Sequence, residues 1–150
     1  MPTLKFLETT IDKFIFKVAT DRYYSSEGLW AQADGNRIRI GISDFLQQRS
    51  GDVAFAEVKP EGTQLTCDDE VAVIETIKVN ISLTSPVTGK IVEINPVMDT
   101  APEVINQDPF GDGWLAVLES TNWDADRLAL LDPQAYFTLM IDQAGQEAEK

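Results

Sequence analysis

Two short runs of β-prone residues on either side of one lysine constrain the fold of this 150-residue chain most strongly. Residues 71–77 are rich in valine and isoleucine, and the second run, residues 79–84, is soon followed by Pro86. β-branched residues favour strands, and proline ends a strand because it cannot donate a backbone hydrogen bond. The pattern predicts a β-hairpin over residues 71–86 with an exposed Lys78 at its tip.

Period-two alternation predicts another hairpin earlier in the chain. Residues 28–33 lead into Asp34-Gly35-Asn36, which is a strong turn signal, and isoleucine then occupies every second position of residues 37–42. Such alternation is typical of a strand with one buried face. We therefore expect a half-buried hairpin with its isoleucines directed inward.

An internal similarity suggests that the β structure is built from two related halves. Residues 72–76 (AVIET) resemble residues 116–120 (AVLES), and residues 51–58 have a looser counterpart in residues 89–95. A repeated β unit implies two similar halves packed face to face. The predicted hairpin that carries Lys78 would then lie near the junction of the two halves.

Helices are predicted only in short pieces. Residues 43–49 form a helix candidate with Ser43 as its N-cap and Gly51 placed to end it. The other candidates are one turn at residues 103–106 inside a surface loop over 95–113, a helix over 124–131, and a helix that starts at Asp132-Pro133 and runs to 143. The last helix has an apolar face of Tyr136, Phe137, Met140 and Ile141, which we expect to lie over the β core rather than to bind a partner. We expect residues 145–150 to fray.

The chain divides into three expected parts. Residues 1–22 contain too many apolar groups for a disordered tail, and a strand-like lead-in packed on the domain is favoured over a partner-docking segment. Residues 23–122 form the main β domain, and residues 123–150 form a C-terminal helical segment.

The charge of the chain argues against two kinds of partner. It has 25 acidic and 12 basic residues, a formal net charge of -13 at pH 7. Such a surface repels phosphate backbones and anionic headgroups, so nucleic acid and membranes are not expected partners. No apolar run approaches the roughly 20 residues of a membrane span, and the first residues do not resemble a signal peptide. A cytoplasmic location is expected.

The residues that the chain lacks exclude much catalytic chemistry. It has no histidine, which excludes Ser-His-Asp and Cys-His catalysis and histidine metal sites. Its single cysteine, Cys67, precedes Asp68, Asp69 and Glu70, whose charges would raise the pKa of the thiol. We expect Cys67 to be structural or incidental and the chain not to be an enzyme.

Several motifs, in their order and spacing, resemble a known family. From Tyr23 to Glu119 the chain is similar to the glycine cleavage system H protein family of lipoyl carriers. The matching motifs are residues 41–45, 51–58, 75–79, 85–95 and 106–115. The stretch from Tyr23 to Glu119 in which they lie covers about two thirds of the chain.

The resemblance implies both a fold and a modified residue. The implied fold is mainly β, a lipoyl-domain-like barrel-sandwich hybrid of two half-units with short helices and a C-terminal helix. The implied cofactor is lipoate, amide-linked to Lys78, and Glu75 matches the acidic position read by the lipoylating enzyme, a ligase or a transferase. Biotin carriers usually flank the lysine with methionines, whereas Ile77 and Val79 stand here, so lipoate is favoured.

The implied function is that of a carrier whose lipoyl arm shuttles an aminomethyl group and reducing equivalents between glycine cleavage enzymes. A tethered arm gains from high effective concentration rather than from catalytic groups on the carrier. Family members usually have a histidine just before the tryptophan that matches Trp30, where this chain has Gly28-Leu29, and residues 1–20 are unlike a family start. Two alternatives therefore stay open: an H-like lipoate-binding protein of a heterodisulfide-reductase-like sulfur oxidation complex, and a lipoate-relay or interaction module.

Overall fold

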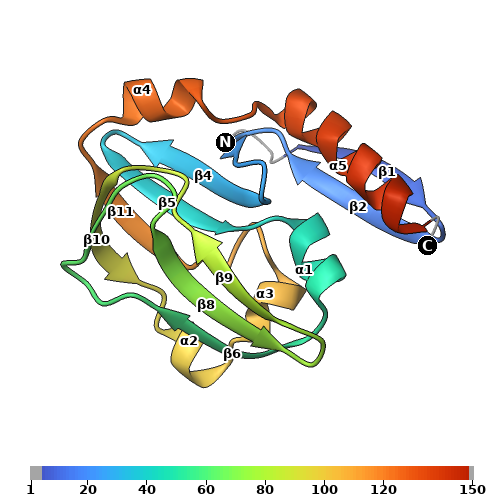
Figure 1. The fold of residues 1–150 in the computed structure, drawn as a ribbon, viewed down its shortest axis with the longest axis horizontal. Coiled ribbons are helices and arrows are strands. Elements are labelled where there is room, and N and C mark those ends of the chain that lie inside the picture. Colours follow the sequence, from blue (N-terminus) through green and yellow to red (C-terminus); the bar gives the residue numbers. More distant parts are fainter. Residues whose placement is uncertain (1–4, 149–150) are drawn as a thin grey trace.

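The computed structural model describes residues 5–148, whose regular structure consists mostly of β-strands (Figure 1). The strands are β1 (Phe6–Ile11), β2 (Phe14–Ala19), β3 (Tyr23–Tyr24), β4 (Leu29–Asp34), β5 (Arg37–Ile42), β6 (Val53–Val58), β7 (Gln64–Leu65), β8 (Glu70–Thr76), β9 (Asn80–Thr84), β10 (Gly89–Ile94) and β11 (Ala116–Ser120). The helices are α1 (Asp44–Ser50), α2 (Val97–Thr100), α3 (Val104–Gln107), α4 (Trp123–Leu128) and α5 (Pro133–Ala148). None of the helices in this described part has the length and hydrophobicity to cross a membrane.

The main body has two sheets that share one core. One sheet has the strand order β3-β4-β5-β11-β10-β7, and the other has the order β6-β8-β9. Buried residues of both sheets meet in a single apolar cluster that includes Ile40, Ile91 and Leu118 from the first sheet and Ile74 and Leu83 from the second. This arrangement is the lipoyl-domain-like barrel-sandwich that the motifs predict, and the predicted fold class is confirmed.

The two predicted half-units correspond to two equivalent strand pairs. β6 pairs with β8, and β10 pairs with β11, antiparallel in both cases. Each pair contains one register shift, near Phe55 in the first and near Glu93 in the second. The sequence similarity between residues 72–76 and 116–120 therefore reflects strands with the same role in different sheets.

The hairpin of β4 and β5 and the helix that follows it form as their local sequence predicts. Ile38, Ile40 and Ile42 are buried. Ser43 caps α1 by accepting a hydrogen bond from the Leu46 amide, and Gly51 ends the helix with a φ of 90°. Local patterning and end caps thus account for this segment.

The N-terminal residues form an element that the sequence did not predict in detail. Instead of one lead-in strand, β1 and β2 make an antiparallel hairpin whose turn residues, Asp12 and Lys13, both have positive φ. The hairpin packs against α5 and α1 at one end of the molecule, where the C-terminal end of α5 also lies (Figure 1). The proposed boundaries at residues 22 and 122 stay predictions.

Three expectations for the helices are wrong. The loop over residues 95–113 contains two short helices, α2 and α3, rather than one turn. α5 continues through Gly145 to Ala148 instead of fraying from residue 145, while residues 149–150 lie outside the described part. Its buried side chains are Tyr136, Met140 and Ala144, whereas Ile141 is exposed, because α5 packs mainly on the N-terminal hairpin rather than over the main β core.

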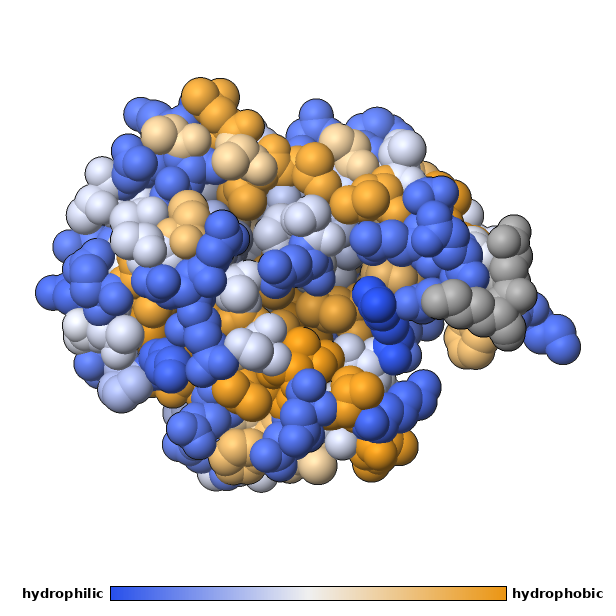
Figure 2. Space-filling view, in the orientation of Figure 1, coloured by the Kyte–Doolittle hydropathy of each residue, from blue (hydrophilic) through white to orange (hydrophobic). Residues whose placement is uncertain are grey.

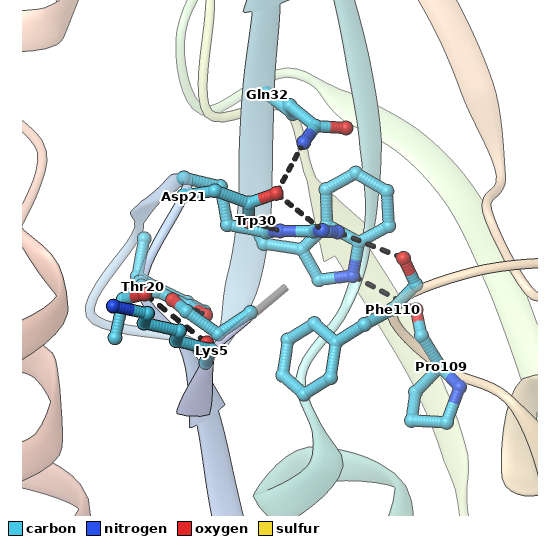
Figure 3. Close-up of polar contacts among 10 residues, drawn as sticks. Lys5, Thr20, Asp21, Trp30, Gln32, Pro109 and Phe110 are labelled. Carbon is cyan, nitrogen blue, oxygen red and sulfur yellow. Dashed lines mark hydrogen bonds and ion pairs between the residues drawn. The ribbon is translucent and has the colours of Figure 1, made fainter. Parts of the chain in front are cut away.

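A buried arginine ties the start of β3 to the segment that follows α3. The Arg22 guanidinium lies 4.5 Å from the Trp30 ring centroid, pairs with Asp21 at 2.7 Å, and donates to the Phe110 carbonyl at 2.9 Å. The Trp30 indole N–H donates to the Pro109 carbonyl at 2.9 Å. The two hydrogen bonds to the carbonyls of Pro109 and Phe110, drawn as dashed lines in Figure 3, hold this loop against β4.

Burial of Tyr136 predicts that the protein loses stability at high pH. The Tyr136 hydroxyl shares a 2.9 Å hydrogen bond with Ser43, and burial raises the pKa of Tyr136 to about 12. The folded chain keeps this proton between about pH 10 and pH 12 while the unfolded chain releases it, so the free energy of unfolding falls as pH rises through that window. Urea unfolding from pH 9 to pH 12 should show a loss of about 3 kcal/mol from this group. Tyr136→Phe should decline less steeply, and an equally steep decline would contradict this account.

Candidate functional site

Lys78 lies at the tip of the β8–β9 hairpin, as the sequence predicts. The tip is the loop between Thr76 and Asn80, and the Lys78 side chain is exposed. Its neighbours Ile77 and Val79 are 75% and 47% exposed. The structure therefore presents one lysine between two apolar side chains at the end of a hairpin.

The Thr76 hydroxyl organises the backbone of this tip. Thr76 Oγ1 accepts hydrogen bonds from the amides of Lys78 at 3.1 Å and Val79 at 3.0 Å, and it donates to the Ser50 carbonyl at 2.7 Å. One side chain thus shapes the turn and anchors it to the end of α1. Threonine favours such local turn hydrogen bonds, but the long-range bond to Ser50 depends on tertiary structure and was missed.

The side chain of Asn106 also supports the hairpin tip, through hydrogen bonds to the segment that follows α1. Asn106 of α3 accepts from the Val53 amide at 2.8 Å and donates to the Gly51 carbonyl at 3.0 Å and to Gln47 at 3.1 Å. These bonds join α3, the end of α1 and the start of β6. Thr76 is also hydrogen-bonded to the C-terminal end of α1, through the Ser50 carbonyl. The loop that carries Lys78 is therefore tied to α1, α3 and β6 by hydrogen bonds.

Gly51 leaves room for the Lys78 stem. A Cβ placed on Gly51 would lie 3.3 Å from Cδ and 3.5 Å from Cε of Lys78, closer than ordinary van der Waals contact for the first atom. The lysine methylenes therefore lie across the backbone at the end of α1. The sequence predicted that Gly51 ends the helix, but not that the Lys78 side chain packs against it.

Glu75, the second predicted site residue, is exposed near the end of β8. In the strand register it lies opposite Asn80 of β9 and Phe55 of β6, and Phe55 is itself exposed. Figure 2 shows hydrophobic residues gathered over the part of the surface that holds β8 and β9. Lys78 thus lies in an apolar surface with the Glu75 carboxylate nearby. The role of Glu75 in recognition by the lipoylating enzyme stays a prediction.

Other reactive groups lie elsewhere. Burial, more than the adjacent acidic run, raises the pKa of the Cys67 thiol, with Asp126 and then Asp68 adding to the effect. The thiol lies 3.3 Å from Asp126. Over residues 5–148 no group of histidine, cysteine and carboxylate side chains is placed to hold a metal ion.

A barrel-sandwich that holds a single exposed lysine on a braced hairpin tip is the arrangement of lipoyl-type carrier domains. The comparisons with known proteins agree. A model of the Glycine cleavage H-protein family matches residues 22–143. The chain belongs to the glycine cleavage H-protein family, whose members are lipoyl carriers.

Individual relatives cover most of the chain. It is 41% identical over 117 residues to the probable glycine cleavage system H protein of Natronomonas pharaonis, covering 78% of this chain and 93% of the relative. It is 37% identical over 126 residues to the glycine cleavage system H protein of Carboxydothermus hydrogenoformans, covering 84% and 96%. The crystal structure of a glycine cleavage system H protein from Mycobacterium marinum superposes with a TM-score of 0.70 at 26% identity, covering 79% and 95%.

Removing the Thr76 hydroxyl should loosen the tip without unfolding the domain. Thr76→Val keeps the shape of the side chain but leaves the Ser50 carbonyl and two tip amides without this partner, which should cost about 1–3 kcal/mol in unfolding free energy. Amide hydrogen exchange at Lys78 and Val79 should accelerate. Thr76→Ser keeps the hydroxyl and is the matched control, so identical exchange in the two variants would contradict the bracing role.

Proposed function

We propose that Lys78 is the lipoyl attachment residue and that the chain carries an aminomethyl group and reducing equivalents between the enzymes of the glycine cleavage system. The observation that carries this proposal is the coincidence of two findings. The family match spans residues 22–143, and within that span Lys78 is presented at an exposed hairpin tip. A primary amine in this position is open to an enzyme that forms an amide bond.

The residues around Lys78 fit a lipoyl group. Gly51 gives the lysine stem a floor without a side chain, and the apolar residues Ile77 and Val79 flank the amine. When bound, the group supplies a dithiolane whose sulfurs accept the transferred group and electrons. The chain itself supplies a braced tip, which holds the tether in one place while the arm moves.

Recognition by partners follows from charge and shape. We infer that Glu75 helps the lipoylating enzyme, a ligase or a transferase, to select Lys78. The net charge of -13 favours partner enzymes with basic docking faces, because complementary charge accelerates encounter. Once docked, the tethered arm samples the partner active site at high effective concentration.

The N-terminal hairpin supports a second candidate. β1 and β2 lie outside the residues that match the family model, and they add a surface beside the tip that a glycine cleavage enzyme would have to accommodate. A carrier with this addition could serve a heterodisulfide-reductase-like sulfur oxidation complex instead, or act as a lipoate relay.

Loading by a glycine decarboxylase separates these candidates. The lipoylated chain, incubated with a glycine decarboxylase and glycine, should gain a methylamine group that intact mass spectrometry detects on the carrier. If the lipoylated chain gains no methylamine and instead binds sulfane sulfur, the glycine role is wrong and the sulfur role replaces it. A form that remains unlipoylated in the presence of a lipoate ligase would contradict both carrier roles.

A further inference from the structure

The N-terminal hairpin has two outer edges, and within residues 5–148 only the β2 edge is bonded by other parts of the chain. β1 and β2 form a two-stranded sheet of their own. On the β2 edge, Asp44 of α1 accepts a hydrogen bond from the Lys17 amide at 2.9 Å, and Gln48 donates to the Ile15 carbonyl at 2.8 Å. We propose that the β1 edge is a docking site for an extended, basic segment of a partner protein, which adds to the hairpin as a third strand.

The strand register shows which backbone groups the β1 edge presents. The Lys5 carbonyl accepts a hydrogen bond from the Thr20 amide at 3.0 Å, and β1 then pairs with β2 without a register shift. In an antiparallel pair, residues bonded to the partner strand alternate with residues whose N–H and C=O groups point away from it. The backbone groups of Phe6, Glu8 and Thr10 therefore point outward, away from β2.

The β1 edge lacks the features that usually prevent strand addition. Proteins commonly block an edge strand with a proline, a lysine or a bulge, or keep it very short. β1 has six residues, FLETTI, with neither proline nor lysine, and its pairing contains no bulge. The side chains of Phe6, Glu8 and Thr10 are exposed. An added strand gains main-chain hydrogen bonds at such an edge, and its side chains determine specificity.

Charge determines which kind of segment fits this edge. Glu8 lies in the middle of it, and no ion pair between described residues involves Glu8. Lys17 is opposite Glu8 on β2, but its ammonium lies 5.7 Å from the Phe6 ring centroid. A basic residue opposite Glu8 on the added strand would form a favourable cross-strand pair. A second copy paired along the whole of β1 would instead place Glu8 against Glu8, between chains that each have a net charge of -13.

The position of the hairpin makes a partner docked on β1 a neighbour of Lys78. Asp12 and Phe14 of the hairpin line the same depression of about 250 Å³ as Lys78 does. The hairpin lies beside α5 at one end of the molecule (Figure 1). Both of its strands lie outside residues 22–143, so the match to the family model does not account for them. Docking at β1 needs no lipoyl group, so this inference goes beyond the proposed function and is tested apart from it.

A synthetic strand tests the β1 edge directly. The probe is a cyclised β-hairpin peptide, because cyclisation reduces the entropy lost on binding. The outward-facing positions of one strand are valine, arginine and valine, and a second probe has glutamate in place of arginine. In the free full-length chain, the amides of Glu8 and Thr10 should exchange with solvent faster than those of Leu7 and Thr9. When roughly nine tenths of the chain is bound, the arginine probe should slow exchange at Glu8 and Thr10 about tenfold.

Variants of β1 distinguish strand addition from other kinds of binding. Thr10→Pro removes an outward N–H while keeping every bond to β2, and proline is tolerated at such edge positions. It should bind the arginine probe roughly fivefold or more weakly, whereas Thr10→Val keeps the N–H and should bind like the wild type. The wild type should prefer the arginine probe to the glutamate probe by about three- to tenfold, and Glu8→Lys should reverse this preference.

Three results would overturn the docking proposal. They are unchanged exchange at Glu8 and Thr10 at the highest soluble concentration of the arginine probe, equal binding of the two probes by the wild type, and Thr10→Pro binding as well as Thr10→Val. If Thr10→Pro disrupts the hairpin, fast exchange at Thr9 reveals it, and the reversal in Glu8→Lys then decides.

Sedimentation of the chain alone tests the other occupant of this edge. We expect a monomer, and a dimer that Glu8→Lys or Thr10→Pro alters would show that β1 pairs with a second copy, which overturns the partner proposal. None of these measurements depends on lipoate. The absence of a lipoyl adduct at Lys78 would overturn the proposed function and leave the β1 edge as described.

Discussion

Replacing Lys78 with arginine is expected to abolish lipoylation and every transfer that depends on it. Arginine keeps the positive charge, but its guanidinium is always protonated and does not form the lipoyl amide. Lys78 is exposed in a turn, so the free energy of unfolding should change by no more than about 0.5 kcal/mol. Intact mass after co-expression with a lipoate ligase, together with methylamine loading by a glycine decarboxylase, measures the loss.

Lys90 offers the control for this variant. Lys90 lies on β10, the strand that corresponds to β6 in the other half of the domain. Its side chain is exposed, as that of Lys78 is. Lys90→Arg should be lipoylated and loaded like the wild type. A lipoyl adduct that survives Lys78→Arg and disappears in Lys90→Arg would place the attachment site in the wrong half of the domain.

Replacing Trp30 with alanine is expected to produce the largest loss of stability. Trp30 is fully buried, and it also carries the hydrogen bond to Pro109 and the contact with Arg22. Large-to-small substitutions of this kind cost about 3–5 kcal/mol, a large share of the roughly 5–15 kcal/mol that stabilises a typical domain. Urea unfolding should show this loss. Lipoylation of Lys78 should also slow, because the Pro109 segment adjoins α3, whose Asn106 supports the hairpin tip.

Gly41 provides a test that the Trp30 ring is placed as described. A Cβ on Gly41 would lie 2.5 Å from Cζ2 of Trp30, so Gly41→Ala should overpack the site and cost about 1–3 kcal/mol. In the double variant with Trp30→Ala the new methyl group enters vacated space, so the combined cost should be smaller than the sum. Additive costs, or a harmless Gly41→Ala, would mean that the ring does not lie against Gly41.

Much of the main domain could be predicted because short-range patterns determine it. The alternating isoleucines of β5, the Ser43 cap of α1 and the two β-prone runs around Lys78 each encode a local structure that tertiary packing then keeps. The internal similarity predicted two related halves, and the structure shows them as the pairs β6–β8 and β10–β11. Local signals and the global fold agree at these places.

The parts that could not be predicted depend on contacts between distant segments or on unusual turns. The β1–β2 turn uses Asp12 and Lys13 at positive φ, where glycine or asparagine is the usual signal. The bracing of the tip by Thr76 and Asn106 exists only after α1, α3 and the hairpin have come together. The predicted apolar face of α5 included Ile141, which is exposed, because α5 buries Tyr136, Met140 and Ala144 instead.

The location of the lipoyl group tests the central claim most directly. The full-length chain is lipoylated by a lipoate ligase, its intact mass is measured, and the modified residue is then located by peptide mass spectrometry. The structure and the family match predict one lipoyl group per chain, on Lys78. A chain that takes up no lipoate, or one that carries it on another lysine, would contradict the assignment of the β8–β9 tip as the carrier site.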